Sequence, residues 1–138
     1  MLRCQCAILA EHIRPGLRNT FDILGVFDRI FARGLPIRHR RMALAILLVA
    51  NGEDDLGKHS IVLRCLSPTG QLLLEQHTSF DLKPEAGNWL GSARFAFQFD
   101  EMLLPEYGRY QLRVDVDGLE VASHRLMVTP ENAAEGTA

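Results

Sequence analysis

The chain has 138 residues, of which 47% are hydrophobic and 23% are charged, and its formal net charge is −2. That composition excludes an intrinsically disordered chain, because disordered chains are poor in apolar residues and carry a high net charge. The length suits one domain, which buries about two thirds of the surface that its unfolded chain exposes and needs no disulfide or metal for stability.

Cysteine usage and the N-terminal residues favour a reducing, cytoplasmic location. Three cysteines (Cys4, Cys6 and Cys65) are too few, and odd in number, for a disulfide framework. Arg3 and Gln5 interrupt the first apolar run, so it lacks the continuous apolar core of a signal peptide. The longest apolar run in the chain has about half the length of a membrane span, and we expect no membrane insertion.

Charge is distributed unevenly along the chain. Residues 1–50 contain eight arginines and three acidic residues, whereas residues 51–138 contain seven basic and fourteen acidic residues. Such asymmetry can mark a basic binding surface or head-to-tail association. We expect instead that the two halves neutralise each other across one fold.

Turn-forming residues recur every 10–20 residues, and the runs between them alternate apolar with polar residues. This pattern is typical of an all-β domain. Alternating apolar residues predict a first strand over residues 2–10. Residues 60–66 and 72–80, joined by a turn at Pro68 to Gly70, predict a hairpin, and Ala93 to Phe99 predicts a strand with one buried face.

Two segments leave alternatives open. Thr20 to Gly34 fits an amphipathic helix that stops at Gly34, although Gly25 and the β-formers around it favour a strand. Met42 to Ala50 is apolar on both faces and fits either a central strand or a short buried helix. If it is a strand, its outer face needs a cover, and a second copy of the chain would provide one.

The sequence defines its last hairpin most clearly. Asp117 and Gly118 suit a two-residue type I′ turn, because both positions need positive φ. The turn places Asp115 opposite Glu120, a repulsive pair that we expect to find in solvent. The apolar pattern then changes phase, which predicts a β-bulge near His124. Beyond this hairpin we expect a flexible tail, so that residues 1–129 form a single β-sandwich domain and residues 130–138 the tail.

Several segments resemble a family of small bacterial proteins of unknown function. They are the stretch Ile23-Leu24-Gly25-Val26-Phe27-Asp28-Arg29-Ile30, then Gly108-Arg109-Tyr110, and the closing hairpin from Val116 to Ala122. The resemblance extends over almost the whole chain. It implies strands over residues 22–31 and a β-sandwich, and it implies no catalytic or binding residues.

Tyr110 also fits a tyrosine corner, in which a phenol at the start of a strand bonds back to the preceding backbone. We therefore predict an all-β fold, an immunoglobulin-like antiparallel β-sandwich of seven or eight strands.

No pattern in the sequence points to catalysis. The five histidines are dispersed, and neither a nucleophile elbow nor a phosphate-binding loop occurs. Cys4 and Cys6 would need two further ligands to hold zinc, so we interpret them as small buried hydrophobic residues. Acidic residues gather at one predicted end, where calcium is conceivable but solvated loops are expected; they are Glu53, Asp54, Asp55, Glu85 and Asp117.

Arg38, Arg40 and Arg41 cluster with His39 in a predicted loop. Such charge can bind an anion, or nucleic acid through counterion release. Binding of single strands usually needs interleaved aromatic residues, which this segment lacks. We expect the acidic residues predicted at the same end, Asp100, Glu101 and Glu106, to neutralise it, and we expect no nucleic-acid partner.

These observations favour a non-catalytic interaction or structural module that forms a homodimer or docks to a protein partner. Leu47 and Val49 are the candidate interface residues, because Met42 to Ala50 carries more apolar residues than a one-sided face requires. The alternative is a protein that binds a small molecule or an anion through the Arg38 to Arg41 loop or the loop around Trp89. We expect no catalytic residue, cofactor or metal.

Overall fold

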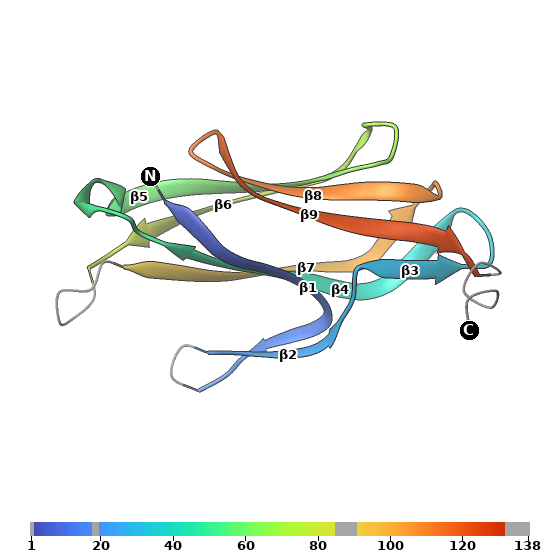
Figure 1. Ribbon diagram of the computed structural model, residues 1–138, viewed down its shortest axis with the longest axis horizontal. Helices are drawn as coiled ribbons and strands as arrows, with labels where there is room; N and C mark the ends of the chain where they lie inside the picture. Colours follow the sequence, from blue (N-terminus) through green and yellow to red (C-terminus); the bar gives the residue numbers. More distant parts are fainter. Residues whose placement is uncertain (1, 18–19, 85–90, 132–138) are drawn as a thin grey trace.

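The computed structural model describes residues 2–17, 20–84 and 91–131, which form nine β-strands and one short 3₁₀ helix. Figure 1 shows the strands in two facing layers, so the predicted β-sandwich is confirmed, with one or two strands more than expected. The elements are β1 (Arg3–Pro15), β2 (Phe21–Val26), β3 (Arg29–Ala32), β4 (Ile37–Val49), η1 (Glu53–Asp55), β5 (Gly57–Leu66), β6 (Leu72–Leu82), β7 (Ser92–Leu104), β8 (Gly108–Val116) and β9 (Leu119–Pro130).

The four-stranded first sheet has the order β2-β1-β4-β7, and the five-stranded second sheet has the order β3-β9-β8-β5-β6. Every neighbouring pair is antiparallel except β3 and β9, which are parallel. That exception departs from the predicted antiparallel arrangement. It arises because the chain crosses from β2 in the first sheet directly to β3 in the second, instead of turning back in a hairpin.

The core lies between the two sheets and is built from alternate residues of each strand. On β4, Met42, Leu44, Ile46 and Leu48 are fully buried. They belong to one cluster with buried residues of the second sheet, among them Leu63, Leu112 and Leu126. Met42 to Ala50 is therefore a central strand, and the alternative of a short helix is wrong.

The outer face of β4 is covered in part by the chain itself. β1 pairs with β4 up to Ala10 and with β2 from Ala10 onward, and Figure 1 shows this second half turning away from the second sheet together with β2. Ala43 and Ala45 are buried in a small separate cluster with Ala10 and Ile13, against which Phe21 and Ile23 pack. The β1–β2 hairpin thus supplies cover over one half of this face.

Residues 20–34 form two strands in different sheets, so the favoured strand assignment is confirmed over the helix. The Phe27 amide donates to the Leu9 carbonyl at 3.1 Å, and the Asp28 carbonyl accepts from the Met127 amide at 2.8 Å. These two bonds fix the crossing point between the sheets. Gly25 has φ +73°, a left-handed backbone conformation that favours glycine over residues with a Cβ.

The last hairpin has the predicted turn, with φ of 51° at Asp117 and 82° at Gly118. The predicted bulge exists but lies nearer the turn than His124, because Val114 pairs with Ala122 while Asp115 pairs with Glu120. Asp115 is also buried and not in solvent as expected. Arginines on two strands neutralise it, as described below.

The tyrosine corner at Tyr110 is confirmed. The Tyr110 hydroxyl donates to the Glu106 carbonyl at 2.7 Å and accepts from the Glu106 amide at 2.8 Å, while the ring is fully buried. Most of the predicted tail, residues 132–138, lies outside the described residues. Among the residues that the structure describes, no helix is long and apolar enough to cross a membrane.

Candidate interaction surfaces

The three arginines predicted as an anion site lie on β4 and not in a loop. This corrects the prediction: β4 begins at Ile37, directly after Pro36, and pairs with the end of β7. The Arg38 Nη1 donates to the Glu101 carbonyl at 3.3 Å, and the Arg41 Nε lies 3.4 Å from the Asp100 Oδ1.

A surface hollow of about 400 Å³ at this position is lined by Arg40, Arg41, Asp100 and Glu101. It presents two basic and two acidic side chains, so an anion entering it would meet both signs of charge. The predicted neutralisation is present for Arg41 and Asp100. Glu106 instead accepts a hydrogen bond from Thr69 at 3.0 Å.

Leu47 and Val49, the candidate interface residues, continue the outer face of β4 beyond Ala43 and Ala45. Both are partly buried, whereas Ala43 and Ala45 are 3% and 2% exposed under the hairpin. The outer face of β4 is therefore covered around Ala43 and Ala45 and partly open to solvent around Leu47 and Val49. Sequence reasoning found the two-sided apolar strand but not its intramolecular cover.

Strand β2 forms one edge of the first sheet and carries exposed apolar residues. Leu24 is 58% exposed and Val26 is 67% exposed. Its charged residue, Asp22, is paired with Arg14 of β1 at 3.3 Å. The strand contains no lysine, arginine or proline, the residues that commonly protect a free sheet edge.

A groove opens between β6 and β7, which are edge strands of the two sheets and lie next to each other. It has a volume of about 520 Å³. Gln76 reaches toward β7, where its Nε2 lies 3.5 Å from the Gln98 carbonyl. No motif in the sequence indicated this groove, because it depends on how two strands distant along the chain approach each other.

His59 joins three segments at the opposite end of the sandwich. Its Nδ1 lies 2.6 Å from the Asp117 Oδ2, and its Nε2 lies 2.5 Å from the Asp55 carbonyl. Both partners are acceptors, so both ring nitrogens satisfy their contacts only as donors, which is the imidazolium form. Burial lowers the pKa of His59, but the hydrogen bonds to Asp117 and Asp55 outweigh it and hold the pKa above its ordinary value.

The carboxylates of the acidic residues beside His59 accept hydrogen bonds from nearby backbone amides. The Asp55 carboxylate accepts from the amides of Asn51 and Gly52, and the Asp117 carboxylate accepts from the Ser60 amide at 2.9 Å. The Ser60 and His59 donors hold the pKa of Asp117 below its ordinary value. Within the described residues no group of three metal-binding side chains occurs, and Glu85 lies outside them.

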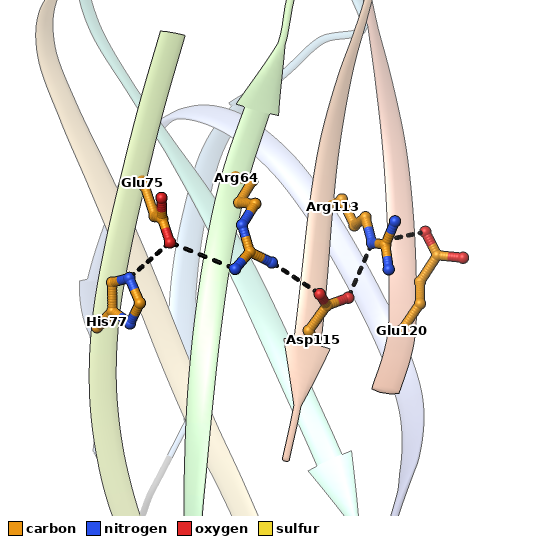
Figure 2. Close-up of polar contacts among 6 residues, drawn as sticks. All are labelled: Arg64, Glu75, His77, Arg113, Asp115 and Glu120. Atoms are coloured by element: carbon orange, nitrogen blue, oxygen red, sulfur yellow. Dashed lines mark hydrogen bonds and ion pairs between the residues drawn. The ribbon is translucent and has the colours of Figure 1, made fainter. Parts of the chain in front are cut away.

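Figure 2 shows a chain of charges across the outer face of the second sheet. Asp115 of β8 accepts from the Arg64 Nη1 at 2.8 Å and from the Arg113 Nε at 2.9 Å, and its side chain is only 6% exposed. Arg64 also pairs with Glu75 on β6, which in turn contacts His77. Arg113 also pairs with Glu120 on β9, so the charge network spans four strands. The sequence signal that could have located it is Arg64 at the centre of a predicted strand.

Burial raises the thiol pKa of two of the three cysteines, Cys65 and Cys4. Cys65 is buried in the core, and burial raises the pKa of its thiol to about 12. Burial also raises the pKa of the Cys4 thiol, which donates to the Cys6 carbonyl at 3.2 Å. Cys6 is exposed and so does not fit the predicted role of a buried small hydrophobic residue. Trp89 and its loop lie outside the described residues.

Residues 5–129 match the model of a family of unknown function, DUF6941. The chain belongs to this family. The match confirms the expected membership of an uncharacterised family. A comparison with curated proteins finds no match.

Two solved structures resemble the chain at low sequence identity. The chain resembles part of the alkylpurine DNA glycosylase AlkC of Pseudomonas fluorescens, bound to DNA containing an abasic site analog, with 12% identity and a TM-score of 0.52. The match covers 93% of this chain and 30% of the glycosylase chain, and it supports the two-sheet fold alone. An immunoglobulin-like protein from Pseudomonas aeruginosa matches with 16% identity and a TM-score of 0.43, covering 93% of this chain and 96% of the other.

Proposed function

We propose that the protein is a non-catalytic interaction module that forms a homodimer through the β2 edge and the adjoining outer face of the first sheet. The observation that carries this proposal is the exposure of Leu24 and Val26 on an edge strand that contains no lysine, arginine or proline. An edge strand offers unpaired backbone groups to another chain, and exposed apolar side chains make that pairing favourable. Leu47 and Val49, partly open on β4 beside the first half of β1, are a second apolar region of the same sheet.

Charge substitutions on this surface test the proposal. The variant Leu24→Lys with Val26→Lys places two charged side chains in the proposed interface, where they would lie against apolar side chains or against the partner's lysines. We therefore expect this variant to be a monomer at concentrations where the unmodified chain is a dimer. Leu47→Lys with Val49→Lys should weaken the dimer as well. Sedimentation equilibrium measures both masses, and circular dichroism confirms that the variants are folded.

Leu119→Lys is the matched control, because Leu119 is 55% exposed but lies on the second sheet. It should leave the dimer unchanged. A variant with Leu24→Lys and Val26→Lys that keeps the mass of the unmodified chain would refute the proposed surface.

Anion binding by Arg38, Arg40 and Arg41 remains the alternative function and has weaker support. Two of the four side chains lining the hollow are acidic, and the guanidinium of Arg41 already has a carboxylate partner. We therefore expect Arg40→Ala with Arg41→Ala to leave any affinity for inorganic phosphate unchanged, as measured by isothermal titration calorimetry. A loss of measurable phosphate affinity in that variant would favour the alternative.

A further inference from the structure

We propose that the groove between β6 and β7 binds an extended peptide that carries a basic side chain. This binding site is separate from the proposed dimer surface, because β2 and β7 form opposite edges of the first sheet. Its wall includes the apolar side chains Leu73, Leu74, Phe99 and Met102. These can contact the apolar side chains of a strand laid along the groove.

The backbone of β7 offers hydrogen-bonding groups to such a strand. The Gln98 carbonyl lies within reach of the Gln76 side chain, so it points into the groove and away from β4. In an antiparallel strand the N–H and C=O of one residue point to the same side, which directs the Gln98 amide into the groove as well. A peptide can replace the long Gln76 contact with two backbone hydrogen bonds, as in strand addition to a sheet edge.

The charge of the groove selects the partner. Asp100 and Glu101 are the charged residues in its described lining, and no basic residue is among them. Asp100 is partly neutralised by Arg41, whereas the Glu101 carboxylate forms no ion pair with any described residue. Glu101 also adopts φ +55°, a region that costs energy for a residue other than glycine.

These features separate a peptide from other partners. The acidic lining opposes a nucleic acid, because phosphates would meet carboxylates. The free edges on both sides of the groove favour an extended backbone over a compact small molecule. A lysine or arginine in the peptide would supply the charge that Glu101 lacks.

The test is an NMR titration of the isotope-labelled full chain with blocked nonapeptides of alternating valine and threonine. One peptide carries a central lysine, a second a central glutamate, and a third the lysine with N-methylated amides at alternate positions. We expect amide shifts in residues 72–76 and 96–102 with the lysine peptide and affinity about fivefold weaker for the glutamate peptide. The N-methylated peptide should not bind, since it cannot pair with a strand edge.

Two variants locate the site. Gln98→Pro removes the free amide without removing a bond to β4 and should abolish binding, as edge positions tolerate proline. Glu101→Lys should reverse the preference between the lysine and glutamate peptides, while Glu53→Lys at the other end of the sandwich should not. The absence of shifts at millimolar peptide, equal binding of all three peptides, or shifts that map to β2 would each overturn the proposal.

A dimer disrupted by Leu24→Lys and Val26→Lys should still bind the lysine peptide. Loss of peptide binding in that variant would mean that the groove depends on the dimer, and would also contradict the inference.

Discussion

Tyr110 illustrates how much a single residue can reveal when its signal is local. A tyrosine at the start of a strand, four residues after Glu106, predicts a hydrogen bond to the preceding backbone, and the structure contains both bonds of that arrangement. Asp115 shows the opposite case. Its neighbour Glu120 was foreseeable from the turn, but its burial depends on Arg64, which lies 51 residues earlier in the chain. Local spacing cannot supply a contact of that kind.

Removing the Tyr110 hydroxyl should destabilise the fold. Tyr110→Phe leaves both the Glu106 amide and its carbonyl without their partner, so we expect the free energy of unfolding to fall by about 1–3 kcal/mol. Urea denaturation measures the change. Tyr107→Phe is the control, because its hydroxyl makes one long contact of 3.4 Å to the Ala32 carbonyl. An equal loss in both variants would show that the corner has no special role.

His59 should make stability depend on pH in two directions. Its pKa in the folded state lies above the ordinary 6.5, so its contribution is complete below pH 6.5 and is lost as the pH rises through the folded-state pKa. The pKa of Asp117 lies below the ordinary 3.8, so its contribution is present above that pH and is lost on acidification. We expect a stability maximum between these two values.

Thermal melting across pH 3 to 9 tests this expectation for His59. Both His59→Gln and Asp117→Asn should flatten the decline on the alkaline side, because either change removes the ion pair. Asparagine suits position 117, which has φ 51°. A decline that persists in both variants would assign the alkaline titration to another group.

At the scale of elements, periodicity predicted the strands well but not what covers them. The continuous apolar run from Met42 to Ala50 correctly indicated apolar residues on both faces. The cover over Ala43 and Ala45 comes from β1 and β2, which bend away from their own sheet. The phase change in β9 likewise predicted a bulge, but its position was set by the pairing of Val114 with Ala122. Register between strands is tertiary information that one strand's sequence holds only in part.

The charge network ties four strands of the second sheet together, and Asp115 is its centre. Asp115→Asn keeps the size of the side chain but leaves Arg64 and Arg113 adjacent without their shared carboxylate. Because Asp115 is buried, we expect a loss of about 1–3 kcal/mol in the free energy of unfolding. Glu120→Gln, at the exposed end of the network, should cost less than about 1 kcal/mol. A loss at Asp115 no larger than that at Glu120 would show that Asp115 is not the energetic centre of the network.

At the scale of the whole molecule, the two-layer sandwich followed from composition, turn spacing and alternation. The parallel pairing of β3 with β9 did not, since a four-residue strand carries too little pattern to reveal its neighbour. Some of the candidate surfaces could likewise be predicted from the sequence, and others could not. Leu47 and Val49 were visible as an apolar excess, whereas the β6–β7 groove and the exposed β2 edge required the sheet order.

The proposed function depends most directly on the mass of the unmodified chain in solution. Native mass spectrometry and sedimentation equilibrium, each over a wide range of protein concentration, measure that mass without any substitution. The account predicts a species of twice the chain mass, which dissociates on dilution. A monomer at every concentration would contradict self-association through the first sheet.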